Sequence, residues 1–331
     1  MKAYLIRRFL LLIPTFLGIS ALSFAVIQLA PGNPVSLRLM KIQGAMGSDS
    51  VPEEVIQRTK ELYGLDKPIP VQYALWLKRL VTFDFGTSYK DRRPVLEKIG
   101  EALPITLQIN ILSILIIYLL SVPLGVFSAV KQATWADSFT TFVLFLLYSL
   151  PSFWVAMLLI YFLGGGQFLD WFPIYGINSL GADQMAWWPW VKDRMWHLAL
   201  PTFCLTYTGF AYISRYARSG MIDVIRQDYI RTARAYGFSN KVVIFKYAFR
   251  NSLIPIITLL GTLLPALLGG SVIIEQIFSI PGMGRLGFEA ILSRDYPLVM
   301  GILAISALLT LVGLIVSDIL YALTDPRIRF E

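Results

Sequence analysis

The chain has little charge, one cysteine and one histidine, and each shortage excludes a class of protein. Only 15% of its 331 residues are charged, against about a quarter in soluble globular chains, so a water-soluble domain is excluded. Cys204 is the only cysteine, which rules out a disulfide within the chain, and we expect it to be a buried small apolar residue. With His197 alone, no haem, zinc or nucleophile–base set is evident, and we expect this residue at the membrane interface.

The sequence also lacks the G-x-x-x-x-G-K-[ST] pattern, so ATP binding through a P-loop is excluded. Ion-coupled carriers and pumps usually hold carboxylates or histidines at mid-membrane depth. The apolar runs of this chain hold none at their centres, since Glu275 comes at the outer end of one run and Asp318 near the inner end of another. An ion-coupled carrier is therefore disfavoured, and energy for active transport would have to come from another subunit.

Hydrophobic residues make up 56% of the chain and gather in long uncharged runs. A helix needs roughly 20 apolar residues to cross the hydrocarbon core, and helix satisfies its own backbone there. Each run therefore predicts a membrane-spanning helix, and the fold class is an all-α integral membrane protein with about six spans. The runs cover residues 9–29, 105–130, 139–163, 198–214, 253–274 and 298–317.

The basic residues fix the predicted topology. They gather at the amino end, between residues 215 and 250, and at the carboxyl end. With six spans all three groups fall on one side, which the positive-inside rule makes cytoplasmic, so both termini are expected there. The net charge of +8 is thus explained by topology, and nucleic-acid binding is not expected. Residues 164–196 carry five tryptophans, as suits an outer interfacial belt.

This topology predicts three parts: a first span at residues 1–30, an extracytoplasmic insertion at 31–104, and a core of five spans at 105–331. Within the insertion we expect short helices at about 55–63 and 71–81 and a turn at 84–87. A further apolar stripe before the second span predicts a helix lying in the interface. Its residues are Val95, Leu96, Ile99 and Leu103.

The cytoplasmic connection at 215–251 is the most informative part of the core. Residues 221–236 suit a helix, Gly237 stands where a left-handed cap is wanted, and Ser239 can cap a second helix that runs to Asn251. One face of the first helix is predicted to hold Ile225, Tyr229, Ala233 and Tyr236. Such a helix pair suits docking of a partner, but an amphipathic helix on lipid headgroups would show the same pattern.

The residues of this connection resemble a known motif. The stretch Asp228-Tyr229-Ile230-Arg231-Thr232-Ala233-Arg234-Ala235-Tyr236-Gly237 is similar to the cytoplasmic coupling motif of binding-protein-dependent ABC importer permeases, in the form shown by the peptide/nickel family and its dipeptide-permease B branch. Arg231 takes the place of the glutamate of the general motif, so a glutamate salt bridge to the ATPase is not expected. The coupling residues that the resemblance implies are Asp228, Tyr229, Arg231, Thr232, Ala233, Arg234, Ala235, Tyr236 and Gly237.

Further matches follow one another along nearly the whole chain. They include Pro31-Gly32-Asn33-Pro34, Gly64-Leu65-Asp66-Lys67-Pro68, Asp84-Phe85-Gly86-Thr87-Ser88, Ile280-Pro281-Gly282-Met283-Gly284-Arg285 and Asp325-Pro326-Arg327. One such motif would be weak support, but their number and order make the resemblance strong. It implies the type I importer permease fold in a bacterial or archaeal cytoplasmic membrane.

The resemblance also implies partners and a substrate. It implies a second homologous permease, two cytoplasmic ATPase subunits that bind ATP and magnesium, an extracytoplasmic solute-binding protein that touches the insertion, and surrounding lipid. This chain would hold no cofactor, no metal and no catalytic residue. The expected cargo is a short peptide, with nickel chelates, glutathione, opines or sugar oligomers as alternatives. Small residues at Ala233, Ala235 and Gly237 would allow close approach of an ATPase.

Overall fold

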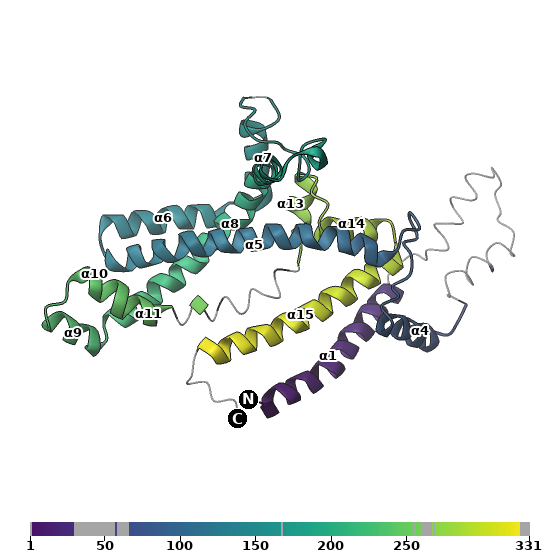
Figure 1. The fold of residues 1–331 in the computed structure, drawn as a ribbon, viewed down its shortest axis with the longest axis horizontal. Helices are drawn as coiled ribbons and strands as arrows, with labels where there is room; N and C mark the ends of the chain where they lie inside the picture. The colour runs from purple at the N-terminus through teal and green to yellow at the C-terminus, as the bar shows by residue number, and fades with distance from the viewer. Residues whose placement is uncertain are drawn as a thin grey trace. The chain divides into compact units, whose positions relative to one another are not determined.

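The computed structural model describes residues 2–29, 57, 66–166, 168–253, 256–257, 259, 267 and 269–324. These residues form helices and connecting turns, and the pairing of Thr87 with Pro94 is an isolated bridge outside any strand (Figure 1). The chain divides into two compact units, one of Met1–Ala102 with Leu286–Leu311 and one of Leu103–Arg285 with Val312–Glu331. Apart from residue 57, the helix predicted at 55–63 lies outside the described residues, as does half of the fifth predicted span.

In the first unit, helix α1 (Lys2–Leu29) covers the first predicted span, and α4 (Ile69–Val81) confirms the helix predicted at 71–81. The two helices are joined by polar contacts: the hydroxyls of Ser20 and Tyr73 lie 2.8 Å apart, and Gln28 Nε2 donates to Gln72 Oε1 at 2.7 Å. Phe24 adds an aromatic contact with Tyr73 at 5.3 Å between ring centroids. Part of the insertion therefore packs on the first span.

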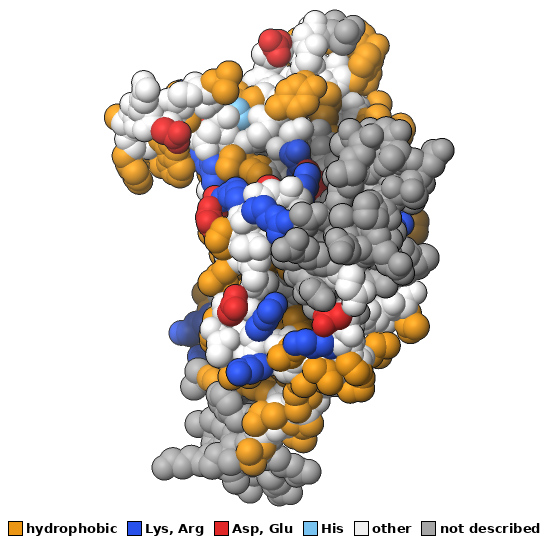
Figure 2. Space-filling model, turned by 90° about the vertical axis from the view of Figure 1, so that its right-hand side faces the viewer, with side chains coloured by type: hydrophobic (Ala, Val, Ile, Leu, Met, Phe, Trp, Pro, Cys, Tyr) orange, Lys and Arg blue, Asp and Glu red, His pale blue; other side chains and the backbone are white. Residues whose placement is uncertain are grey.

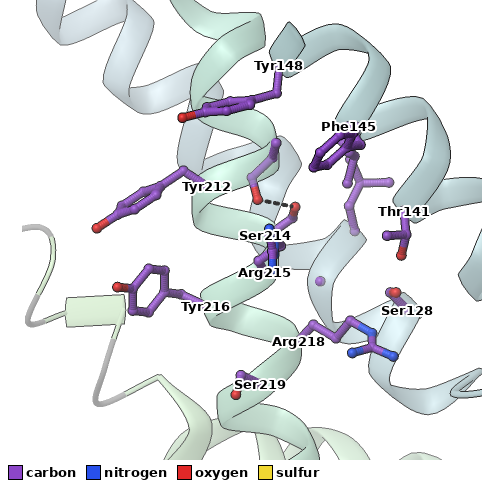
Figure 3. Close-up of a pocket in the computed structure, with 14 residues that line it drawn as sticks. Ser128, Thr141, Phe145, Tyr148, Tyr212, Ser214, Arg215, Tyr216, Arg218 and Ser219 are labelled. Atoms are coloured by element: carbon purple, nitrogen blue, oxygen red, sulfur yellow. Dashed lines mark hydrogen bonds between the residues drawn. The ribbon is translucent and has the colours of Figure 1, made fainter.

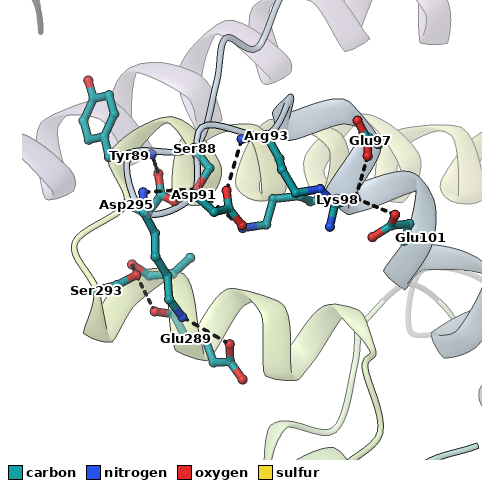
Figure 4. A network of polar contacts seen from close by, with 12 residues as sticks. Ser88, Tyr89, Asp91, Arg93, Glu97, Lys98, Glu101, Glu289, Ser293 and Asp295 are labelled. Atoms are coloured by element: carbon teal, nitrogen blue, oxygen red, sulfur yellow. Dashed lines mark hydrogen bonds and ion pairs between the residues drawn. The ribbon is translucent and has the colours of Figure 1, made fainter.

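A polar cluster links the segment before the second span to the start of α15 (Tyr296–Thr324) (Figure 4). Asp295 is fully buried and accepts hydrogen bonds from the Ser88 hydroxyl and, at 2.9 Å, from the Tyr89 N–H. Burial alone raises the pKa of Asp91, but hydrogen bonds from Lys98 and Ser88 outweigh this and lower the pKa to about 2. These contacts fix the loop on the helix, because each buried polar group is paired.

The turn predicted at 84–87 has a physical cause in the structure. Asp84 Oδ1 accepts a hydrogen bond from the Gly86 N–H at 3.1 Å, which is an Asx turn. Gly86 has φ +72°, a conformation that glycine adopts without a Cβ clash. The following loop then leads directly into the next helix.

The helix predicted before the second span is present and continues into that span, while its position in the interface stays a prediction. Helix α5 runs without a break over Val95–Val130, with Pro104 and Pro123 inside it. The positions buried on either side of Pro104 follow spacings of three and four residues, so they lie on one helical stripe. They are Val95, Ile99, Ala102, Thr106 and Ile109. Pro104 does not end the helix, because the buried positions before and after it keep the same helical spacing.

The third predicted span is broken. It forms α6 (Trp135–Ser149) and α7 (Ser152–Leu163), whose axes differ by 93°. Leu150 is extended (φ −83°, ψ 128°), as the residue before a proline prefers, so Pro151 ends the first helix. The carbonyl of Leu150 accepts a hydrogen bond from the Tyr207 hydroxyl at 2.7 Å. A side chain from the next long helix therefore holds the bend.

That next helix is α8 (Trp187–Ile225). It contains the predicted fourth span, residues 198–214, and extends beyond it at both ends. Cys204 is 1% exposed and belongs to an apolar cluster with residues of α5, α7 and the chain around Ile274, which confirms its expected role. His197 is also buried, with Nδ1 2.9 Å from the carbonyl oxygen of Asp193. It therefore packs inside its unit, and the interfacial depth expected for it stays a prediction.

By length and composition, α5 and Tyr296–Ser317 of α15 can each cross a membrane, and the bent pair α6–α7 can form a third span. Large apolar side chains such as Leu115 and Leu119 of α5 are exposed, and Figure 2 shows groups of exposed hydrophobic side chains on both sides of a central stripe of charged ones. Exposed apolar surface of this extent suits contact with lipid rather than water. The described residues thus form an all-α membrane protein.

Candidate coupling site

The stretch 215–251, for which a cytoplasmic position is predicted, contains a short helix, α9 (Asp228–Ala235), after the end of α8. The single helix predicted at 221–236 is wrong, because α8 ends at Ile225 and Gln227 is extended (φ −70°, ψ 151°). The Gln227 carbonyl accepts the N–H of Ile230 at 3.1 Å, so a new helix starts there. Asp228 stands in its first turn, where the helix dipole favours a carboxylate.

The end of α9 confirms the predicted left-handed cap at Gly237. This residue has φ +78°, and its N–H donates to the Arg234 carbonyl at 2.9 Å. The Phe238 N–H donates to the Ala233 carbonyl at 3.3 Å. Together these two bonds make a Schellman motif, which requires a left-handed residue and so favours glycine.

A second helical stretch follows the cap. It consists of α10 (Asn240–Val242), the π-helical turn η2 (Val243–Ala248) and α11 (Phe249–Ser252). Ser239 stands at the predicted cap position, but its side chain makes no capping bond. The predicted helix to Asn251 is therefore present, with a widened turn in its middle. Such π-helical turns are frequent at functional sites.

The four residues predicted to share one face of the helix expected at 221–236 do not all do so. Ile230 is fully buried and Ala233 nearly so, whereas Tyr229 and Tyr236 are 40% and 79% exposed. The predicted face is wrong because Ile225 belongs to α8, so the register of α9 starts afresh at Asp228. Ile230 and Ala233 pack in an apolar cluster that draws on α5, α8 and η2. Its other members are Val126, Ala129, Met221, Val243 and Ala248.

The remaining surface of α9 is polar and exposed. It presents Arg231 with Asp228 at 3.6 Å, in an ion pair whose side chains are both largely in solvent. Ala235 and Gly237 are also exposed, and a Cβ added to Gly237 would meet nothing within 4 Å. Of the three small residues expected at the docking surface, Ala233 is instead turned into the apolar cluster. The Tyr229 hydroxyl accepts a hydrogen bond from Asn251 Nδ2 at 2.8 Å, which ties α9 to α11.

A partly buried ion pair lies beside this apolar cluster and joins α5, α6 and α8. Helices α5 and α6 run side by side in Figure 1. Arg218 donates from Nε and from one terminal nitrogen to the two oxygens of Asp137, at 3.0 and 2.8 Å. Asp137 also accepts from the Ser128 hydroxyl and, at 3.1 Å, from the Ala133 N–H. Bidentate geometry and four donors make this a strong, directional contact.

Close backbone packing complements the ion pair. A Cβ on Gly125 of α5 would lie 2.4 Å from the Ser214 carbonyl oxygen and 2.5 Å from Ala217 Cβ, both on α8. Only glycine allows this approach. A displacement of α9 would therefore also displace α5 and α8, because close-packed contacts transmit such a movement.

A cavity of about 460 Å³ opens between α5, α6 and α8 next to the ion pair (Figure 3). Tyr148, Tyr212 and Tyr216 lie in a row along one side, and Thr141 and Ser128 lie opposite. Among the residues that the structure describes, Arg215 and Arg218 are the only charged ones that line the cavity. Its remaining wall is mostly apolar.

A buried carboxylate marks the other end of the second unit. Glu275 of α13 (Val272–Ile277) accepts the Arg285 N–H at 2.7 Å and the Thr106 hydroxyl at 3.3 Å. A Cβ on Gly282 would lie 2.5 to 2.7 Å from the Glu275 carboxyl group. The Pro-Gly-Met-Gly stretch therefore wraps this side chain, and glycine is needed for the close contact.

Comparison with known proteins decides the family. Residues 121–330 match the binding-protein-dependent transport system inner membrane component, and residues 1–110 match the N-terminal part of such membrane components. The chain belongs to this family of inner membrane transport components. Over its full length, and the full length of the relative, it is 42% identical to the "Oligopeptide transport system permease protein AppB" of Bacillus subtilis (strain 168).

Two further relatives match the whole chain. It is 38% identical to the "Dipeptide transport system permease protein DppB" of Alkalihalophilus pseudofirmus, which is covered completely. It is 35% identical to the "Peptidoglycan transport system permease protein YejB" of Agrobacterium fabrum, of which 99% is covered. The resemblance inferred from the motifs is therefore confirmed, and the chain is a permease.

Sequence reasoning missed the permease's partly buried ion pair. Asp137 is the only carboxylate between Glu101 and Asp170, and it stands at the edge of an apolar run. An isolated acidic residue at such a position needs a partner, because an unpaired buried charge is costly. This signal could have singled out Asp137, although it does not say that Arg218 is the partner.

Replacement of Ile230 by alanine is expected to loosen α9 from the permease. Ile230 is fully buried in the apolar cluster, and loss of such a side chain costs about 2–5 kcal/mol. Amide hydrogen exchange in α9 should become at least about tenfold faster. Without the isoleucine side chain, local opening of α9 exposes less apolar surface and therefore costs less free energy. Arg234→Ala, on the exposed face of the same helix, is the control and should leave the exchange nearly unchanged. Equal exchange in both variants would show that Ile230 does not anchor α9.

Proposed function

We propose that this permease forms half of the translocation pathway of an ATP-driven importer of short peptides. A second, related permease completes the pathway, two cytoplasmic ATPase subunits bind ATP and magnesium, and a solute-binding protein delivers the cargo from outside. In this arrangement both termini of the chain and α9 lie in the cytoplasm, and the chain itself hydrolyses nothing. The names of the relatives from Bacillus and Alkalihalophilus support a peptide cargo.

The observation that carries the proposal is the two-sided construction of α9. One face is anchored by Ile230 in the cluster that also holds residues of α5 and α8, and the other face is exposed and polar. A helix built in this way suits a groove of an ATPase, and its movement would be passed to the long helices. Coupling requires that docking energy differ between the inward-open and outward-open states.

The same construction speaks against a helix that only rests on lipid headgroups. Such a helix turns its apolar face to the bilayer, whereas the apolar residues of α9 are buried against the protein's own helices. The exposed Arg231 already has Asp228 beside it, which weakens its attraction to anionic lipid. Docking of a protein partner is therefore the better account of α9.

The deciding experiment measures uptake of labelled di- and tripeptides, and separately of nickel, in cells with and without this chain. The cells should lack other peptide importers. We expect peptide uptake to be lost without the chain and to be restored by the wild type, but not by a variant with residues 231–237 scrambled. Unchanged peptide uptake would remove the peptide assignment and leave the permease family standing.

A second cargo class has a specific observation behind it. The relative from Agrobacterium is named for peptidoglycan transport, so fragments of the cell wall are the first alternative to plain peptides. Uptake of a labelled muropeptide in the same cells distinguishes the two. Loss of muropeptide uptake alone would favour the alternative.

A further inference from the structure

The cavity between α5, α6 and α8 has no part in the coupling role. We infer that it binds the C-terminal carboxylate of the transported peptide, with Arg215 as the cation and Tyr148, Tyr212 and Tyr216 as the surrounding wall. This inference rests on the proposed peptide import and deepens it by naming a subsite of the pathway. Its volume of about 460 Å³ falls within the range of about 300–1,000 Å³ for pockets that hold small molecules.

The polar groups of the cavity argue that it faces water or protein rather than lipid. Tyr148, Tyr212 and Tyr216 are between 42% and 57% exposed, and Arg215 is exposed as well. A hydroxyl or guanidinium that faced hydrocarbon would have no hydrogen-bond partner, which is costly. Ionisable residues within membrane helices therefore turn toward the bundle interior or a water-filled cavity. A transport pathway is such a cavity.

The charge of the cavity selects an anion. Arg218 is neutralised by its bidentate contact with Asp137. Arg215 has no carboxylate partner among the described residues, and the residues that line the cavity include no aspartate or glutamate. One guanidinium thus stands free at the wall, with two donors in a fork that matches a carboxylate.

The form of the wall suits a peptide of variable sequence. Tyr212, Arg215, Tyr216 and Ser219 follow one another at helical spacing on α8, so they share one face. Aromatic rings and small hydroxyls contact many side chains without requiring any of them, as the adaptable surfaces of binding proteins do. The carboxylate is the one group that every free peptide carries at its end, so a single arginine can recognise all of them.

The first test compares two peptides in the complete transporter reconstituted in vesicles with its binding protein at saturation. One is a tripeptide with a free C-terminal carboxylate, and the other is the same tripeptide as its C-terminal amide. Arg215→Gln is expected to lower initial uptake of the free acid about tenfold and to change uptake of the amide less than about twofold. Because only the ratio of the two rates reports on carboxylate binding, a general folding defect cannot imitate it.

The control is Lys192→Gln, which removes one exposed cation from the other end of α8. It should keep the wild-type ratio. The inference would be overturned if Arg215→Gln left the ratio of the two initial uptake rates unchanged, whether both rates fell equally or neither fell. If the wild type takes up neither peptide, the proposed function itself is wrong, so the two failures are distinguishable.

The second test asks what occupies the cavity. Ser219→Cys places a thiol on its wall, and Cys204 gives little background because it is buried. During ATP turnover the free-acid tripeptide should slow maleimide labelling of this thiol at least about threefold, and should not slow it in the Arg215→Gln background. Protection by phosphatidylglycerol with no peptide present would show a lipid site and overturn the inference.

Discussion

Replacement of Gly237 by leucine is expected to reduce peptide uptake at least about tenfold while the ATPase subunits still copurify with the permease. Gly237 has φ +78°, and a residue with a Cβ is strained there by roughly 1–2 kcal/mol. The space around it is open within the chain, so a leucine side chain would project from the end of α9 into a docked partner. ATP hydrolysis should continue without transport, because the partner would bind but no longer move α9.

Two matched variants separate backbone strain from bulk. Gly237→Asn is expected to keep most of the uptake, since asparagine tolerates the left-handed conformation and is shorter than leucine. Gly181→Leu imposes the same strain at φ +81°, also in open space, before the 3₁₀ turn η1 (Ala182–Gln184). Uptake per ATP hydrolysed should stay at the wild-type value in Gly181→Leu. If Gly237→Leu also keeps that value, α9 does not dock through Gly237.

Much of the helical architecture follows from the sequence because it depends on local properties. Long uncharged runs predict helices wherever they occur, and α4 and the left-handed Gly237 follow from capping residues and short-range periodicity. The register of α9 was not predictable in this way. The break at Gln227 leaves the apolar pattern of 221–236 continuous, so the position of the buried face depends on where the second helix starts.

The features missed by sequence analysis depend on residues far apart in the chain. The bend at Pro151 is fixed by Tyr207, which is 57 positions from the Leu150 carbonyl that it binds. Asp137 and Arg218 are 81 positions apart, and several arginines precede and follow Arg218. From sequence alone, each of these arginines indicates only a cytoplasmic position. Only the packing of α6 on α8 selects the one that meets Asp137.

That selection predicts a large effect on stability. Asp137→Ala is expected to lower the free energy of unfolding by about 3 kcal/mol, since it leaves the Arg218 charge without its partner. It also leaves the Ala133 N–H and the Ser128 hydroxyl without an acceptor. The midpoint of thermal unfolding of the purified permease should fall by roughly 5–10 °C. Glu97→Ala is the control, because its ion pair with Arg93 is exposed and should contribute less than about 1 kcal/mol.

A double-mutant cycle isolates the contact between Asp137 and Arg218. Arg218→Ala should also destabilise, because it leaves the Asp137 carboxylate without its cation. The double variant should be less destabilised than the sum of the single variants, because it removes both charges and leaves neither one unpaired. Since the ion pair joins α5, α6 and α8 beside the anchor of α9, the single variants should also lower uptake per ATP hydrolysed. Additive effects on stability would mean that the two side chains act separately. Normal coupling in a stable Asp137→Ala permease would mean that α9 moves the long helices by another route.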